Sequence, residues 1–253
     1  MSESATLVFL CFVAFMAGLL NSIGGGGAIL KIPAMLLFGV TPQQAVAVTK
    51  FGGMFGHATA LFAFARHGYV PYKPALIALP CSLVGAGIGS QCLMFIPPDL
   101  AGKIVAVVLP LVAFFLLFPW KNRKPAENIP SGRRFWIILP LTCFIVGIYD
   151  GAFGAAGATF LILGLHLFVR LDLVHANALS KVTSTVSCLS STCVFLLNGQ
   201  VLFFYAIPMA VTEMLGNVVG SRLAMLKGSR IVRVFMLVSV TLMFCSLIAK
   251  YFF

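Results

Sequence analysis

Charged residues are scarce in this sequence of 253 residues. Only 9% of the residues are charged and only six are acidic, whereas 60% are hydrophobic and the mean hydropathy is +1.07. A soluble domain carries about 25% charged residues, so this chain has too little polar surface to cover a globule in water. The composition excludes a soluble enzyme, a disordered tail and a nucleic-acid-binding module, and it predicts a protein of the lipid bilayer.

Metal-binding and nucleotide-binding motifs are also missing. The seven cysteines show no C-x-x-C spacing, and most of them lie in apolar runs, where they behave as small hydrophobic residues. No H-E-x-x-H, no G-x-x-x-x-G-K-[ST] and no complete G-x-G-x-x-G occurs. We therefore expect no metal, no cofactor, no enzyme activity and no nucleic-acid partner.

Long apolar runs fill most of the chain. A spanning helix needs about 20 apolar residues, and backbone groups inside lipid must be paired, which favours helices. The apolar runs are 5–23, 28–40, 44–66, 70–95, 98–119, 135–151, 155–171, 174–197, 201–225 and 231–252. They predict an all-α polytopic membrane protein, a single membrane domain over 1–253 with about eight to ten membrane segments.

The two halves of the chain repeat one another. A shift of 131 residues aligns two pairs of motifs: Ala45-x-Ala47-x-Thr49-Lys50 with Ala176-x-Ala178-x-Ser180-Lys181, and Gly85-x-x-x-Gly89 with Gly216-x-x-x-Gly220. The glycine motifs are faces that let two helices approach closely. We therefore predict one repeat over 5–119, a connection at 120–134 and a second repeat over 135–252.

Basic residues predict how the repeats are oriented. The 120–134 connection contains five of them: Lys121, Arg123, Lys124, Arg133 and Arg134. Basic residues mark the cytoplasmic side of a membrane protein, so we place this connection in the cytoplasm, beneath a cell (inner or plasma) membrane. Counting crossings from there puts most other basic residues, Lys31 among them, on the same side. Each half then crosses an odd number of times, which predicts inverted repeats. This prediction is the same whether the segment at 28–40 crosses the membrane or dips in and returns.

Glycines interrupt the apolar runs at matching places in both halves. They are Gly24, Gly25, Gly26 and Gly27 in the first half, and Gly151, Gly154 and Gly157 in the second. A helix that starts at such a break points free N–H groups and a positive dipole end at whatever lies in front of it. Broken helices at the interface of inverted repeats form the binding sites of secondary transporters. Two facing breaks predict an anion site; the alternative is that the glycines only permit tight packing.

Lys50 and Lys181 lie about seven residues inside long apolar runs, at equivalent positions of the two repeats. An ammonium at that depth costs a few kcal/mol and is rare without a partner or a function. We expect both lysines to bind the anion; the alternative is that they reach the headgroups along their aliphatic stems. Polar residues beside them or on the same helix face complete the predicted substrate site: Thr49, Asn177, Ser180 and Ser184.

Four other polar residues lie inside or beside the apolar runs. His57 is either a proton-relay group or a hydrogen-bonded packing residue. Glu213 must pair with a cation or stay protonated, so it either couples transport to protons or forms a salt bridge to one of the lysines. Asn21 and Asp150, just before the glycine breaks, are expected to cap the following turns.

Several of these motifs resemble a known family when taken together. They are Gly18–Gly27, Pro33 and Thr41–Lys50 in the first half, and Gly147–Gly154, Ala176–Lys181 and Asn198–Val201 in the second. In order and spacing they resemble the TauE/SafE family, described as sulfite exporters, over nearly the whole chain. The resemblance implies a polytopic inner-membrane permease for small sulfur-containing anions such as sulfite or organosulfonates.

The predicted function is therefore a secondary transporter, by resemblance an exporter, of a small sulfur oxyanion or organosulfonate. Two alternatives stay open: an uncoupled anion channel, and a membrane subunit that anchors a partner without transporting anything. The expected partners are the anionic substrate and the lipid bilayer, and a homo-oligomer is left open.

Overall fold

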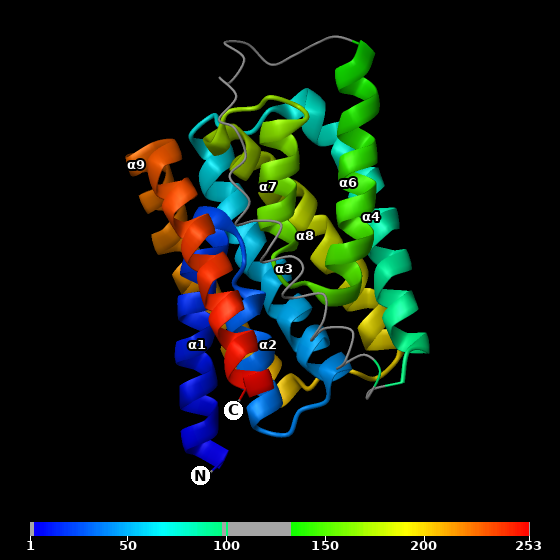
Figure 1. The fold of residues 1–253 in the computed structure, drawn as a ribbon, viewed down its shortest axis with the longest axis vertical. Coiled ribbons are helices and arrows are strands. Elements are labelled where there is room, and N and C mark those ends of the chain that lie inside the picture. The colour runs from blue at the N-terminus through cyan, green and yellow to red at the C-terminus, as the bar shows by residue number, and fades with distance from the viewer. Residues whose placement is uncertain (1–2, 98–99, 101–132, 253) are drawn as a thin grey trace.

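The computed structural model of the protein describes residues 3–97, 100 and 133–252. Within these ranges the chain forms a bundle of helices (Figure 1). The helices are α1 (Glu3–Gly24), α2 (Ala28–Leu37), α3 (Pro42–Arg66), α4 (Tyr72–Phe95), α6 (Arg133–Phe153), α7 (Gly157–Leu167), α8 (Leu173–Leu197) and α9 (Phe203–Phe252). The predicted run at 98–119 and the connection at 120–134 lie almost wholly outside the described residues.

Five of these helices are long and apolar enough to cross a bilayer. The candidate spans are α1, α4, Phe135–Phe153 of α6, α8, and Phe203–Lys227 of α9. The helix α3 is as long as α8, but its hydropathy is lower because it contains polar residues such as Lys50 and His57. These helices confirm the predicted all-α polytopic membrane fold.

The runs at 201–225 and 231–252, predicted as two helices, form one helix in the structure. Both belong to α9, which is 50 residues long and bends back on itself, so that the two runs form its two arms (Figure 1). No proline separates the two runs, and the pair Gly228-Ser229 between them is of the kind that kinks a helix without ending it. The last part of α9 returns toward the end of the molecule that holds the N-terminus (Figure 1).

The helices α2 and α7 are too short to cross a membrane. They contain 10 and 11 residues, about 15 to 17 Å of helix, roughly half of a 30 Å hydrocarbon core. Each follows a glycine break, and each packs between two long helices, α2 against α1 and α3, and α7 against α6 and α8. Each break therefore leads into a half-helix, a helix too short to cross a bilayer by itself, so α2 is not a full span.

The helix contacts follow the same pattern in both halves. The helix α1 packs against α9 as α6 packs against α4, and α3 and α8 pack against each other. Figure 1 shows α1 and α3 running away from the end that holds the N-terminus, and α6 and α8 running toward it. Inverted repeats would produce this arrangement, and the repeat relation itself stays a prediction.

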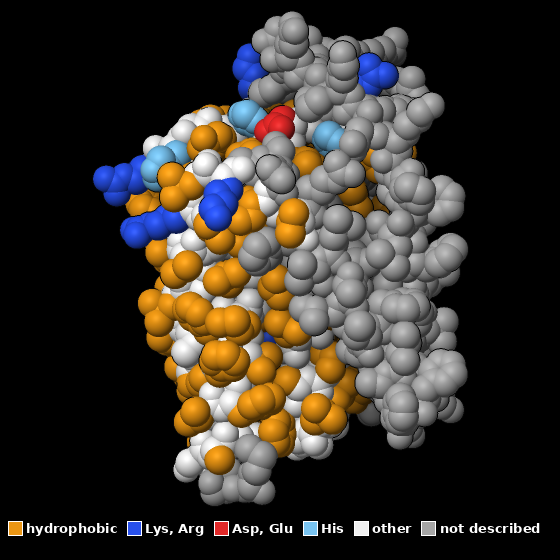
Figure 2. Space-filling view, turned by 60° about the vertical axis from the view of Figure 1, so that its left-hand side comes forward, with side chains coloured by type: hydrophobic (Ala, Val, Ile, Leu, Met, Phe, Trp, Pro, Cys, Tyr) orange, Lys and Arg blue, Asp and Glu red, His pale blue; other side chains and the backbone are white. Residues whose placement is uncertain are grey.

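Exposed basic residues lie at one end of the bundle, while apolar side chains cover its long face (Figure 2). They lie at the end of α3, at the start of α4, in the α7–α8 connection and in the middle of α9: Arg66, Lys73, Arg170, Arg222 and Lys227. These parts of the chain meet at the end opposite the N-terminus (Figure 1). An apolar belt with a basic end fits a protein that spans a bilayer.

Glycines allow α4 and α9 to lie directly on their neighbours. A Cβ atom at Gly89 would overlap the carbonyl oxygen of Ile148 in α6, and one at Gly216 would overlap that of Phe15 in α1. Only glycine permits such close backbone contact. The two Gly-x-x-x-Gly motifs are therefore packing faces, as predicted.

We expect Gly89→Ala to lower the free energy of unfolding by about 3 kcal/mol, the upper range for overpacking, because the new methyl group would push α4 away from α6. Gly87 on the same helix is the matched control, since its Cβ would meet only the hydroxyl of Ser190 at 3.0 Å. Thermal unfolding of both purified variants in one detergent measures the difference. Equal melting temperatures would contradict the packing role of Gly89.

Candidate functional site

The two glycine breaks meet inside the bundle. The hydroxyl of Thr159, in the first turn of α7, donates a hydrogen bond to the carbonyl oxygen of Gly24 over 3.0 Å. A Cβ atom at Gly25 would lie 2.6 Å from the backbone nitrogen of Thr159. Gly25 and Gly154 have φ angles of +81° and +69°, in the left-handed region that favours glycine. The two half-helices therefore begin next to each other.

A small cavity lies beside these helix starts, and we call it the central cavity. Its volume is about 20 Å³, room for roughly one water molecule. Both breaks and the surrounding helices line it: Asn21, Gly26, Ala28, Lys31, Thr49, Lys50, Gly53, His57, Asp150, Gly154, Ala158 and Cys188. The predicted site residues Gly26, Thr49, Lys50, His57 and Gly154 are thus brought together around one space.

Lys50 forms a buried ion pair across the bundle. Its Nζ atom lies 2.7 Å from Oδ2 of Asp150 in α6, and only 2% of Lys50 is exposed. The same carboxylate accepts a hydrogen bond from the hydroxyl of Ser187 in α8. Both of these bonds are made by Oδ2, while Oδ1 faces Gly157, the first residue of α7, so the prediction that Asp150 caps the next turn stays a prediction.

Lys181 is also buried, and its partner is a neutral group. Its ammonium donates to the main-chain carbonyl oxygen of Asn21 near the end of α1, where the helix dipole is negative; the same oxygen also accepts the backbone N–H of Gly25 over 3.2 Å. Nearby, Asn177 donates to the carbonyl oxygens of Ser22 and Ile23, both over 3.0 Å. Since both Lys50 and Lys181 are buried, neither reaches the headgroups, and that alternative is excluded.

Sequence reasoning missed Lys31, which it placed on the inner face of the membrane. Lys31 is 1% exposed, and its Nζ atom lies 2.6 Å from Oε2 of Glu213 and 3.3 Å from the carbonyl oxygen of Thr49. Asn21 donates to the other carboxylate oxygen of Glu213 over 3.1 Å. Glu213 thus has the cation that its depth requires, but the cation is neither Lys50 nor Lys181. The signal was available, because a lysine early in a run too short to cross has no surface to reach.

Asn21 caps the first half-helix, as the sequence predicts. Its side-chain oxygen accepts a hydrogen bond from the backbone N–H of Gly27, at the start of α2, over 2.8 Å. Together with the bonds to Lys181 and Glu213, this contact joins α1 to α2, α8 and α9 at one residue.

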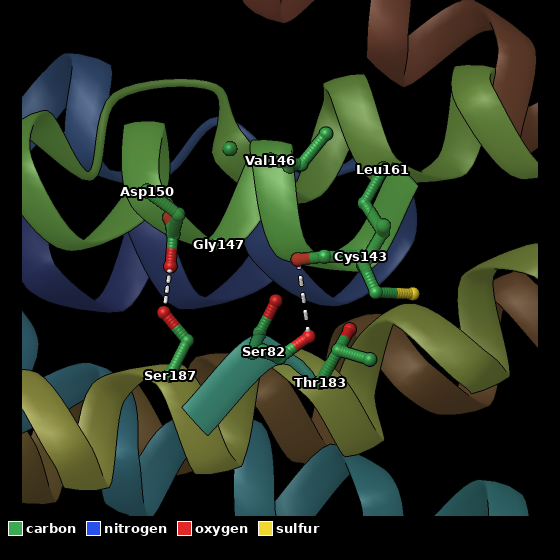
Figure 3. A pocket seen from close by; sticks show the side chains of 10 residues that line it. Ser82, Cys143, Val146, Gly147, Asp150, Leu161, Thr183 and Ser187 are labelled. Atoms are coloured by element: carbon green, nitrogen blue, oxygen red, sulfur yellow. Dashed lines mark hydrogen bonds between the residues drawn. The ribbon is translucent and has the colours of Figure 1, made fainter. Parts of the chain in front are cut away.

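A second, smaller cavity lies on the other side of Asp150, and we call it the serine cavity (Figure 3). Its volume is about 10 Å³. Figure 3 shows Ser187 bonded to Asp150 and Ser82 bonded to the backbone of Cys143, with the side chain of Thr183 nearby. Gly157 and Ser184, predicted for the substrate site, line this cavity instead.

The remaining predicted residues lie around the two cavities without lining them. Ser180 donates to the carbonyl oxygen of Asn177 within its own helix over 2.7 Å. The others adjoin the central cavity through the breaks or the bonds described above: Gly24, Gly25, Gly27, Asn177, Lys181 and Glu213. Among the described residues, no group of three or more His, Cys, Asp or Glu side chains is placed to hold a metal ion.

Two polar atoms at the central cavity have unused hydrogen-bonding capacity. Thr49 Oγ1 and His57 Nδ1 have no hydrogen-bond partner within the described part of the chain. Thr49 is 5% and His57 6% exposed, and an unsatisfied polar atom at such depth costs about 1 to 3 kcal/mol. His57 is therefore not fully accounted for as a packing residue, and both atoms are available to a ligand or a water molecule.

The chain is similar to known proteins over most of its length. The family model described as "Sulfite exporter TauE/SafE" matches residues 10–247. "Probable membrane transporter protein ORF9" of Sinorhizobium sp is 34% identical over 230 residues, 90% of this chain and 86% of that protein. "Probable membrane transporter protein YfcA" of Escherichia coli (strain K12) is 30% identical over 225 residues, 88% and 82% of the two chains. "Sulfite exporter TauE/SafE family protein 5" of Arabidopsis thaliana is 31% identical over 131 residues, 50% of this chain and 26% of that protein.

We expect Glu213→Gln to lower the free energy of unfolding by about 3 kcal/mol or more, because it leaves the ammonium of Lys31 buried without a carboxylate. The double variant Lys31→Met/Glu213→Gln is the matched control, since it removes both charges and should regain most of the loss. Thermal unfolding in detergent compares them. A double variant no more stable than the single one would show that the pairing of the two charges is not the cause.

Proposed function

The chain belongs to the TauE/SafE sulfite exporter family, and on this premise we propose that it is a secondary transporter of a small anion across the cell membrane. The chain is a membrane transporter of the TauE/SafE type. For the substrate we favour a sulfur oxyanion or organosulfonate such as sulfite, which in its singly protonated form, hydrogensulfite, carries one negative charge; the direction is outward, because the family's description names sulfite export.

The observation on which this proposal depends is the burial of cations where two half-helices begin. Lys50 lines the central cavity, and the starts of α2 and α7 contribute Gly26, Ala28 and Ala158 to its wall. Helix N-termini attract anions through their N–H groups and their dipole, and an ammonium forms charge-assisted hydrogen bonds with oxyanions. We propose that these groups replace the water around the anion, with Lys181 adding positive charge from α8.

The size of the central cavity supports alternating access over an uncoupled channel. About 20 Å³ is less than an oxyanion of several heavy atoms needs, and nearly all the residues that line the cavity are buried. Loading therefore requires the helices to move, and rocking of two inverted repeats around a central site provides such a movement. The buried cations also argue against a purely anchoring subunit, because a scaffold does not need them.

Two further elements of the proposal concern sidedness and coupling. We place the basic end of the bundle and the 120–134 connection in the cytoplasm, since basic residues mark that side. Of the two coupling candidates, we favour His57, because its ring lines the central cavity with a free Nδ1 atom. Glu213 is already bonded to Lys31 and Asn21. We therefore assign it a structural role, as part of an ion pair that closes the site.

We expect Lys50→Met and Lys181→Met each to weaken sulfite binding and transport about tenfold or more, since a hydrogen bond to a charged group contributes about 1.5 to 3 kcal/mol. Lys73→Met is the matched control, because Lys73 is exposed at the start of α4. Binding is measured by thermal stabilisation with sulfite, and transport by flux in proteoliposomes. Both site variants must first run as single species of normal helix content; wild-type sulfite handling in both would refute the lysine roles.

We also expect sulfite flux to saturate with concentration and to be accelerated by sulfite on the opposite side of the membrane, because a site that is exposed alternately returns faster when loaded. The measurement is radiolabelled or fluorometric flux in proteoliposomes with and without internal sulfite. A steady anion conductance that persists without any ion gradient would favour the channel.

A further inference from the structure

We propose that the site selects an anion with a single negative charge, and that Asp150 sets this preference. The inference rests on the proposed transport of small anions and adds the charge of the substrate to it. It is carried by the balance of charges inside the bundle.

The buried charged side chains leave one positive charge without a partner. Among the described residues, the buried cations are Lys31, Lys50 and Lys181, and the buried carboxylates are Asp150 and Glu213, so three minus two leaves one. The two ion pairs account for Lys31 and Lys50. Within the described part of the chain, Lys181 donates to a neutral carbonyl oxygen and forms no ion pair with a carboxylate. An uncompensated charge is unfavourable in an apolar interior, and one monovalent anion neutralises it.

The unpaired charge arises from a difference between two corresponding places. Lys50 and Lys181 occupy equivalent positions in the sequence repeat, and each meets the helix that precedes a glycine break. In α6 that helix offers Asp150, and in α1 it offers Asn21. A Cβ at Gly157 would overlap Asp150, and a Cβ at Gly27 would lie 2.7 Å from the side chain of Asn21, so the two residues sit in the same relation to their breaks.

The presence of an aspartate at one of these places and an asparagine at the other determines the charge that the site needs. With a carboxylate at both places the buried charges would cancel, and no anion would be required. With an amide at both places two positive charges would be left, and a doubly charged anion would balance them. The chain has one of each, which matches a monovalent anion.

The position of Asp150 also makes it a competitor for the ligand. It lines the central cavity and the serine cavity, and its Oδ2 atom accepts hydrogen bonds from both the ammonium of Lys50 and the hydroxyl of Ser187; Figure 3 shows the bond to Ser187. An anion that approaches Lys50 must share the ammonium with this carboxylate. A second negative charge on the anion would be repelled at close range, whereas the hydroxyl of Thr49, which has no hydrogen-bond partner among the described residues, can donate to an anion of either charge.

The test compares two tetrahedral anions that differ in charge, methanesulfonate with one charge and sulfate with two. Dissociation constants for both are measured on the purified full-length protein by thermal-shift titration and calorimetry at constant ionic strength. The wild type should bind methanesulfonate more tightly. Asp150→Asn should move the ratio of the two dissociation constants toward sulfate by about tenfold or more. Asn21→Asp should weaken the binding of both anions.

A second pair of variants keeps the test decisive if Asp150→Asn does not fold. Glu213→Gln also removes one buried carboxylate and should move the ratio in the same direction. Lys73→Met removes one exposed positive charge outside the site and should keep the wild-type ratio. This separates the effect of the buried charges from that of charge elsewhere on the protein.

Three results would overturn the inference: a wild type that prefers sulfate, variants that keep the wild-type ratio, or a wild type stabilised by sulfite but by neither probe. A wild type that binds none of the three anions, neither sulfite nor either probe, would instead refute the proposed function. The two failures are therefore distinguishable in the same titrations.

Discussion

Charge pairing inside an apolar bundle is the constraint on which the rest of this structure depends. Separated from water, an ammonium or a carboxylate is stable only beside a partner, and here the partners come from different helices. Lys50 of α3 meets Asp150 of α6, and Lys31 of α2 meets Glu213 of α9. Each pair therefore fixes the position of one helix relative to another at the depth of the proposed site.

Glycine provides the backbone geometry that lets these pairs form. The half-helices begin part-way through the bundle because the breaks at Gly25 and Gly154 adopt left-handed conformations, and the glycine faces of α4 and α9 allow close helix contact. The ends of two half-helices, two cavities and the buried cations are consequently gathered in one region. A fold built of uninterrupted spans would offer no free helix starts there.

Much of this arrangement can be read from the sequence, because it depends on local patterns. The apolar runs give the helices, the glycines give the breaks and packing faces, and the depth of Lys50 and Lys181 indicates that both are buried. The partners of the charges cannot be read in this way, since Lys50 and Asp150 are 100 positions apart and Lys31 and Glu213 are 182 apart. Lys31 was misplaced for a different reason: its run is too short to cross the bilayer, and that length alone indicates a position inside the bundle.

Asn21 has a consequence for how the protein can move. Its carbonyl oxygen, side-chain oxygen and side-chain nitrogen are bonded to α8, α2 and α9 respectively, so α1 cannot shift against any one of these helices while leaving the other contacts unstrained. Small, graded displacements are therefore penalised, and a displacement large enough to exchange the whole set at once is favoured. A molecule joined in this way should switch abruptly between a few discrete shapes. Asn21, through its main-chain oxygen and its short amide side chain, determines how large a displacement the switch requires.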